Sequence, residues 1–241
     1  MADVKALMQE KIKVLDEASK AYYARGEEIM SNFEYDKIYD ELVELEKQSG
    51  IILAGSPTQK VGYEILSELP KEVHPSRMLS LDKTKSREEL KDWLGDHQGI
   101  LSWKLDGLTI VLTYEDGKLL KAVTRGNGDV GEVITANAKT FVNLPHQIAY
   151  KGDLVLRGEA VISYADFDKI NSEIEDSAGK YKNPRNLCAG SVRQLNSEIT
   201  ASRRVRFFAF TLVSAEDMNF KKRSEQINWL KDQGFDTVKE R

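Results

Sequence analysis

The spacing of apolar residues changes at about residue 65, and this change limits the folds that the chain can adopt. Apolar residues recur three and four positions apart over residues 4–22 and again over 35–45, as on one face of an α-helix. Gly26 separates the two runs, and Gly50 follows the second. The pattern therefore predicts a small domain of two helices at about residues 1–65.

From residue 66 onward, alternating strand patterns mix with short helical patterns. Residues 109–114 and 118–125 are predicted strands joined by Glu115-Asp116-Gly117-Lys118, which favours a tight hairpin. Further strands are predicted over residues 100–106, 154–162 and 206–213. Helices are predicted after Ser86, over 133–139, from Ser163 to Ile174, from Asn183 to Leu195 and through 227–232 to Gly234. Such a mixture is typical of an α+β fold with an antiparallel sheet.

Charge and cysteine content exclude several classes of protein. The chain has 35 Lys and Arg against 39 Asp and Glu, a net charge of −4, which still allows nucleic-acid binding through a local basic patch. No apolar run is long enough to span a membrane, and the N-terminus has no secretory signal. Cys188 is the only cysteine, which excludes an internal disulfide and a cysteine-based zinc site. We therefore expect a cytoplasmic protein without a membrane partner.

A glycine-rich loop, Gly126 to Gly131, fits the G-x-G-x-x-G pattern of dinucleotide-binding folds. The preceding strand, however, carries Lys118, Lys121 and Arg125, whereas a central parallel strand is nearly all apolar. That strand also belongs to a hairpin rather than to a crossover connection. We therefore expect a polar turn here, not a Rossmann unit.

Lys104-Leu105-Asp106-Gly107 is a K-x-D-G motif between two predicted strands. The motif alone is weak, because a surface lysine beside a turn gives the same pattern. A lysine amine is a nucleophile only when neutral, and burial or neighbouring cations favour that form. Within a strand, the stem of Lys104 would be half-buried between Trp103 and Leu105. Asp106 would point to the same sheet face and orient the amine or hold a hydrated metal.

Other motifs surround the K-x-D-G motif in a fixed order. They are Tyr22-Tyr23, Glu34 to Leu42, Ser56 to Gly62, Met78 to Asp82, Thr124 to Gly128, Gly131-Glu132, Arg157 to Glu159, Asn183 to Asn186 and Ala189 to Leu195. In this order and spacing, the chain resembles the N-terminal part of bacterial NAD-dependent DNA ligases. The resemblance covers nearly the whole chain, and the combination of motifs is specific although each motif is modest.

The resemblance implies a fold and a reaction. A helical domain that recognises nicotinamide mononucleotide, at 1–65, would precede an ATP-grasp-like nucleotidyltransferase (adenylation) domain, at 66–241, which is incomplete at its C-terminus. Lys104, with Asp106 as a second catalytic residue, would attack the α-phosphate of NAD and keep AMP. The AMP would later pass to the 5′-phosphate at a nick in double-stranded DNA, in replication and repair. NAD and Mg²⁺ are the implied cofactors, and the protein would be a monomer.

The resemblance also implies contacts to NAD. The positions matching the nicotinamide side are Tyr22, Tyr23, Asn32, Tyr35 and Asp36. Those matching the adenosine and phosphates are Ser80, Leu81, Ser102, Arg125, Glu159, Arg185, Arg193 and Phe210. Arg185 and Arg193, eight residues apart on one predicted helix, would project to a similar side and neutralise phosphate. No metal ligand is assigned. Asn32 and Ser102 depart from the family, which has aspartate and glutamate at these positions.

Other functions remain open at this stage. Because the chain stops at Arg241, before later motifs of the family, we expect either a fragment of a longer ligase or a shortened relative that seals nicks poorly alone. The departures at Ser102 and Asn32 and the missing C-terminal motifs motivate one alternative, a non-catalytic module on a nucleotidyltransferase scaffold that binds nucleotide or DNA ends. An ATP-dependent ligase or capping-type enzyme shares K-x-D-G but would not need helices carrying Tyr22 and Tyr35.

Overall fold

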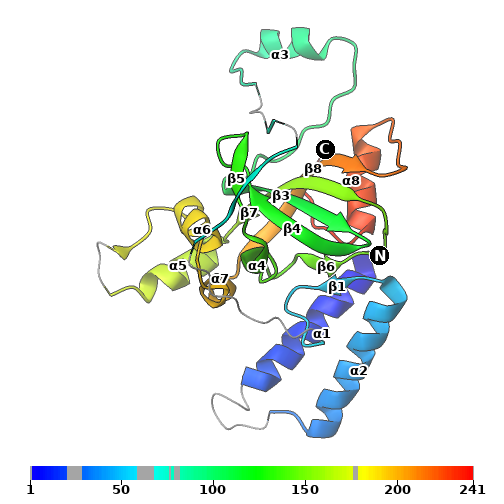
Figure 1. The fold of residues 1–241 in the computed structure, drawn as a ribbon, viewed down its shortest axis with the longest axis vertical. Helices are drawn as coiled ribbons and strands as arrows, with labels where there is room; N and C mark the ends of the chain where they lie inside the picture. Colours follow the sequence, from blue (N-terminus) through cyan, green and yellow to red (C-terminus); the bar gives the residue numbers. More distant parts are fainter. Residues whose placement is uncertain are drawn as a thin grey trace.

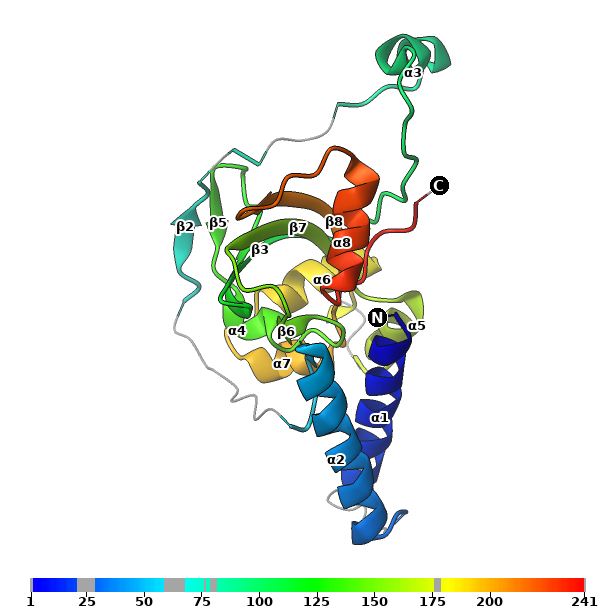
Figure 2. The ribbon, with the colours of Figure 1, turned by 90° about the vertical axis from the view of Figure 1, so that its right-hand side faces the viewer.

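The structure is a computed structural model, and it describes residues 2–20, 29–58, 68–75, 77–78, 82–175 and 179–240. Two long helices lie side by side and extend away from a curved sheet, which short helices flank (Figures 1 and 2). This arrangement confirms the predicted α+β fold. Among the helices of the described residues, none combines the length and apolar character needed to cross a bilayer.

The two long helices are α1 (Ala2–Lys20) and α2 (Asn32–Ser49). Their apolar stripes meet in a small core that includes Met8, Leu15 and Leu42, each at most 1% exposed. The Ser31 side chain caps α2 in a reciprocal capping box with Glu34. Gly50 ends α2 in the left-handed conformation, with φ of 67°, which glycine adopts without strain. The helical spacing of the sequence is therefore confirmed.

A polar cluster ties α1 to the rest of the chain. The Lys5 ammonium donates to the Gly234 carbonyl and, at 2.8 Å, to the carboxylate of Asp236. Asp236 also accepts a hydrogen bond from the buried amide of Asn143, which in turn bonds to the backbone of Phe207. Burial lowers the pKa of Lys5, and the Asp236 carboxylate opposes this shift. The N-terminal end of α1 is thus fixed against the sheet.

The main sheet has six strands in the order β1-β6-β4-β3-β7-β8, and all its pairings are antiparallel. The strands are β1 (Ile52–Leu53), β3 (Leu108–Glu115), β4 (Lys118–Thr124), β6 (Pro145–Gln147), β7 (Leu154–Val161) and β8 (Arg206–Ala215). Asp116 and Gly117 form the predicted turn between β3 and β4, with φ of 47° and 74°.

A second, two-stranded sheet contains the glycine-rich loop. The loop joins β4 to β5 (Val130–Glu132), and β5 pairs antiparallel with β2 (Lys71–Val73). A Rossmann unit needs parallel strands joined through a crossover helix, whereas β4 and β5, on either side of this loop, pair antiparallel with their neighbours. The expectation of a polar turn is therefore confirmed.

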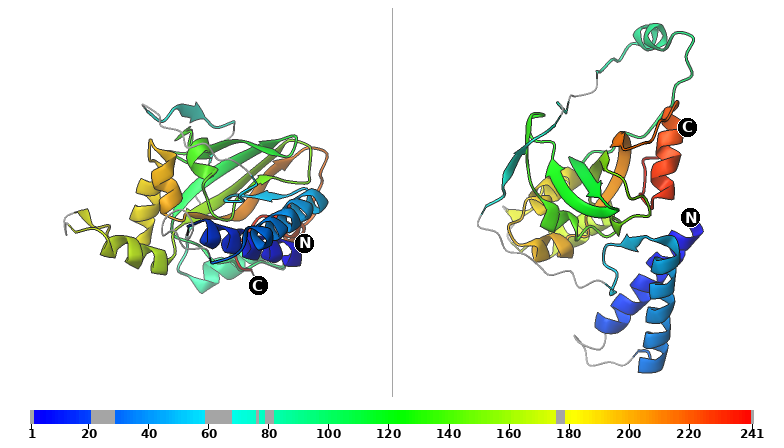
Figure 3. Two further views of the ribbon diagram at one scale, coloured as in Figure 1. Left: turned by 90° about the horizontal axis from the view of Figure 1, so that it is seen from below. Right: turned by 45° about the vertical axis from the view of Figure 1, so that its right-hand side comes forward.

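Shorter helices follow α1 and α2 in the chain, and those other than α3 flank the main sheet. The shorter helices are α3 (Arg87–Leu94), α4 (Thr135–Ala138), α5 (Tyr164–Ser172), α6 (Pro184–Val192), α7 (Ser197–Ser202) and α8 (Arg223–Asp232). Asn183 caps α6 as predicted, with its side chain accepting from the Asn186 amide. Helix α7 was not predicted. Helix α3 has no buried residue and stands apart from the sheet (Figure 3).

The predicted strand over residues 100–106 is wrong. Residues 101–107 form no strand, and only Ser102 makes an isolated bridge, with Glu240. The Trp103 amide donates to the Lys239 carbonyl at 3.1 Å, while the Trp103 side chain is 70% exposed. An apolar alternating segment becomes a strand only where a neighbouring strand pairs along it, and here the pairing is one residue long.

The two faces of the main sheet differ in character. On one face, Leu112 and Leu156 are fully buried in the main core, together with Leu187 and Cys188 of α6. The opposite face carries Thr109 of β3 with Arg157 and Glu159 of β7, because side chains alternate along each strand. The polar face carries the candidate functional residues described below.

Cys188 should be inert in the folded protein. Its Sγ lies 3.2 Å from the Ala160 carbonyl oxygen, and burial, aided by the nearby Glu159 carboxylate, raises the pKa of the thiol to about 12. We expect an aromatic disulfide reagent at pH 8 to react roughly 1,000-fold more slowly with the native protein than with the protein in denaturant. Absorbance of the released thiolate measures this difference, and equal rates in the two conditions would contradict the burial of Cys188.

Candidate functional site

The buried carboxylate of Glu159 fixes the end of the K-x-D-G motif. Its Oε1 accepts from the Gly107 amide at 3.1 Å, and its Oε2 accepts from the Thr109 hydroxyl at 2.8 Å. Thr109 and Glu159 are directly opposite each other on β3 and β7, and Glu159 is only 9% exposed. The strand register therefore brings K-x-D-G beside Glu159, which the resemblance had named.

The expectation of a half-buried Lys104 is wrong. Lys104 is exposed, because the segment that carries it lies outside the sheet. Asp106 does not share a strand face with Lys104, and its carboxylate pairs instead with the Arg185 guanidinium at 2.9 Å. Both partners are more than half exposed, so the pair contributes little to stability. Its effect is to place the first turn of α6 next to the K-x-D-G motif.

Arg125 joins the same polar face from the end of β4. Its amide donates to the Thr109 carbonyl at 2.9 Å, which continues the row formed by Thr109 and Glu159. Its Nε donates to the Met78 carbonyl at 3.0 Å. The structure thus brings Arg125, Glu159 and the end of the K-x-D-G motif to the same sheet face.

Phe210 of β8 borders this face through Arg157 of β7. The Arg157 guanidinium carbon lies 5.7 Å from the centre of the Phe210 ring, a cation–π arrangement. Burial lowers the pKa of Arg157, the neighbouring Arg125 lowers it further, and Glu159 opposes them. Sequence reasoning used Arg157 only as part of a motif and did not assign it to the site.

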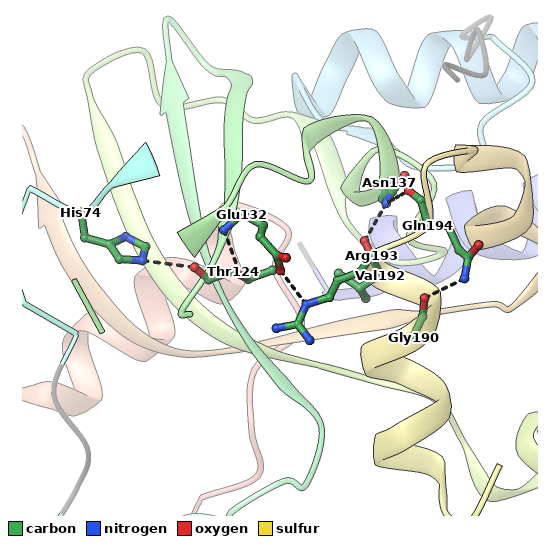
Figure 4. A network of polar contacts seen from close by, with 8 residues as sticks. All are labelled: His74, Thr124, Glu132, Asn137, Gly190, Val192, Arg193 and Gln194. Atoms are coloured by element: carbon green, nitrogen blue, oxygen red, sulfur yellow. Dashed lines mark hydrogen bonds and ion pairs between the residues drawn. The ribbon is translucent and has the colours of Figure 1, made fainter. Parts of the chain in front are cut away.

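Arg193 lies beyond the other end of α6 and has a different partner (Figure 4). Its Nε donates to Glu132 of β5 at 2.6 Å, and the Glu132 amide donates to the Thr124 hydroxyl at 3.0 Å. The buried His74 lies on the other side of this network, with Nε2 3.1 Å from the Thr124 carbonyl oxygen. The network links α6, β4 and β5. The burial of His74 was not predicted, because no local sequence pattern signals it.

The C-terminal end of α6 is also held from α4. The Asn137 amide donates to the Val192 carbonyl at 2.6 Å and to the Gln194 carbonyl at 2.8 Å (Figure 4). These bonds satisfy carbonyl groups that the helix leaves unpaired at its end. Arg185 and Arg193 therefore sit at opposite ends of a fixed helix, each paired with a different carboxylate.

Comparison with known proteins decides the family. Residues 66–241 match the NAD-dependent DNA ligase adenylation domain, and residues 1–62 match the N-terminal NAD⁺-binding domain of DNA ligase-like proteins. The chain belongs to the NAD-dependent DNA ligase family. The polar sheet face with K-x-D-G, Glu159 and Arg125 lies within the part that matches the adenylation domain.

Several curated relatives are named DNA ligase. One from Lachnoclostridium phytofermentans is 66% identical over 230 residues, which cover 95% of this chain and 35% of the relative. One from Ruminiclostridium cellulolyticum is 64% identical over 239 residues, covering 99% and 36%. One from Helicobacter pylori is 40% identical over 238 residues, covering 95% and 36%. The chain thus spans about a third of the length of these relatives.

Several residues predicted from the ligase family lie outside the described part. Tyr22, Tyr23, Ser80 and Leu81 are among them, and the side chains of Asn32 and Asp36 in α2 are not described either. Tyr35 is half-buried against the small core between α1 and α2. Ser102 is exposed in an open groove whose lining includes Trp103, Lys104, Lys231 and Lys239.

The described residues of this ligase-family chain hold no group of three or more His, Cys, Asp or Glu side chains suited to a metal ion. Both oxygens of Glu159 already accept hydrogen bonds, and Asp106 is paired with Arg185. A metal held by protein groups alone is therefore not supported by this part of the chain.

Proposed function

We propose that this chain is the NAD-reacting part of a DNA ligase, in which Lys104 takes AMP from NAD. The observation that carries the proposal is the position of the K-x-D-G motif. Glu159 and Arg185 hold this motif at the polar sheet face that Arg125 and Phe210 border. In this proposal, residues 1–65 recognise the nicotinamide half, and residues 66–241 bind the adenosine half and react with it.

The residue types suit the transfer of a nucleotidyl group. The Lys104 amine attacks the α-phosphorus, a P–N bond forms, and the bond to the bridging oxygen breaks. Nicotinamide mononucleotide leaves, and the amine loses a proton to solvent. Such transfers depend mostly on positioning and on neutralising phosphate charge, which arginine side chains provide. Arg125, Arg185 and Arg193 are the proposed phosphate neighbours, and the Phe210 ring offers a face to adenine.

The exposure of Lys104 is compatible with this role, since a nucleophile must be reached by its substrate. The loop that carries it, rather than the amine, is fixed by Glu159 and Arg185. Mg²⁺ prefers phosphate oxygens and water to a dedicated protein cage. We therefore propose that Mg²⁺ arrives with the phosphates.

The later substrate follows from the same chemistry. AMP on Lys104 would pass to the 5′-phosphate at a nick in double-stranded DNA, the substrate that the name of the relatives suggests. We further propose that the protein acts as a monomer in the cytoplasm.

Mass spectrometry of the intact chain tests this function. After incubation with NAD and Mg²⁺, the chain should gain the mass of one AMP, and peptide mapping should place it on Lys104. NAD binding without an adduct would support the non-catalytic module instead. An adduct formed from ATP but not from NAD would indicate an ATP-dependent ligase or capping-type enzyme.

A further inference from the structure

The guanidinium of Arg157 in β7 has no hydrogen-bond acceptor within the part of the chain that the structure describes. Its Nε is buried without a hydrogen-bond partner, and no ion pair or hydrogen bond to its terminal nitrogens is present among these residues. The residue is half-buried, and the ring of Phe210 is its neighbour on one side. Buried charged donors are nearly always paired, so an unpaired one calls for a missing partner.

The strand register places Arg157 on the polar sheet face. Arg157 is opposite Val111 of β3 and opposite Thr211 of β8, and it lies two residues from Glu159 on the same strand. Residues two apart on a strand point to the same side. The Arg157 guanidinium therefore faces the same side as the carboxylate that holds the K-x-D-G motif.

The neighbours of Arg157 on this face are a second guanidinium and a carboxylate that is already engaged. Arg125 is close enough to lower the pKa of Arg157, and the Glu159 carboxylate opposes this shift. Both Glu159 oxygens accept from Gly107 and Thr109, so the carboxylate is directed at the K-x-D-G motif rather than at Arg157. A bound anion would supply the acceptor that the Arg157 guanidinium lacks among the described residues.

We propose that Arg157 is a further nucleotide-binding residue, whose guanidinium donates to a phosphate oxygen of the bound dinucleotide. This inference rests on the proposed function, because it places the nucleotide on the same sheet face. Phe210 holds the guanidinium plane in place, which reduces the freedom lost on binding. The rival interpretation is that Arg157 only supports the Phe210 ring, without touching the ligand.

Affinities for AMP and adenosine separate these two roles. Calorimetry is carried out in a Lys104→Ala background, so that no covalent adduct occupies the site. Arg157→Met should weaken AMP binding about tenfold, as for the loss of one charge-assisted hydrogen bond, and change adenosine affinity less than about twofold. Arg157→Lys keeps the charge but loses the planar fork. Its AMP affinity should lie between those of the Lys104→Ala parent and the Arg157→Met variant.

Arg203→Met is the matched control. Arg203 also lies over an aromatic ring, 6.0 Å from the centre of Tyr181, but it belongs to the α7 end rather than to the polar sheet face. The Arg203→Met substitution should leave the affinities for AMP and adenosine unchanged. Equal losses for AMP and adenosine in Arg157→Met, or no loss for AMP, would overturn the proposal. If Arg157→Met does not fold, the same two affinities in Arg157→Lys decide.

The outcome is independent of the AMP-transfer reaction. If the wild-type chain forms no adduct with NAD but its AMP affinity depends on Arg157, the proposed function fails and the binding role stands. If the adduct forms at the normal rate and Arg157→Met leaves the AMP affinity unchanged, only the binding role fails.

Discussion

Lys104→Arg should abolish the AMP adduct completely, although it keeps a positive charge at this position. A guanidinium stays protonated at any pH that the protein tolerates, and it offers no lone pair to phosphorus. A side chain of similar length and equal charge preserves the electrostatic attraction for NAD. Intact mass after incubation with NAD and Mg²⁺ should show the unmodified chain alone, while calorimetry should show NAD binding within about threefold of wild type.

Lys118→Arg is the control for this substitution. Lys118 is exposed at the β3–β4 hairpin, away from the K-x-D-G motif, and its variant should gain AMP at the wild-type rate. An adduct of the same size on the Lys104→Arg chain would show that another lysine is the nucleophile. Peptide mapping would then identify that lysine directly.

Local sequence signals predicted most elements because their causes are local. The hairpin at Asp116-Gly117 needs two positive φ angles, and Asn183-Pro184 supplies both a cap and a preset φ for α6. Helix α7 was missed because it has six residues and its buried positions include the polar Ser197 and Thr200. Burial of such residues depends on tertiary packing, which periodicity does not report.

The site was only partly predictable for the same reason. Glu159 and Arg125 could be named from motifs, and the register of β3 with its neighbours brings them together. The partners of Arg185 and Arg193 depend on how α6 packs beside the sheet, which no local pattern specifies. The exposure of Lys104 likewise follows from the lack of a pairing strand. Motifs therefore indicated which residues lie together better than they indicated how deeply those residues are buried.

Gly107→Ala should disrupt the K-x-D-G motif through a direct steric clash. A Cβ at this position would lie 1.9 Å from the Ala160 carbonyl oxygen and 2.8 Å from Cγ1 of Val161. The Ala160 oxygen belongs to the backbone of β7, and Ala160 is opposite Leu108 of β3. This oxygen therefore cannot move away without breaking the β3–β7 pairing. We therefore expect the loop to move and the bond from the Gly107 amide to Glu159 to be lost.

The cost should appear both in stability and in rate. Overpacking costs about 1–3 kcal/mol, which corresponds to roughly 2–12 °C in Tm for a chain of this size. A displacement of about 1 Å at the nucleophile lowers a rate on the order of 100-fold. Differential scanning calorimetry measures the first effect, and the time course of AMP adduct formation measures the second.

Gly99→Ala separates the clash from a general effect of replacing glycine. A Cβ at Gly99 would meet only the flexible Leu94 side chain, at 3.0 Å, and Gly99 lies in the same connection before the K-x-D-G motif. Its Tm should stay within about 2 °C of wild type, because exposed positions tolerate small changes. If Gly107→Ala kept the wild-type Tm and rate, the loop would not be fixed against β7. Glu159 would then not position Lys104, and the link between the sheet register and the reaction would be lost.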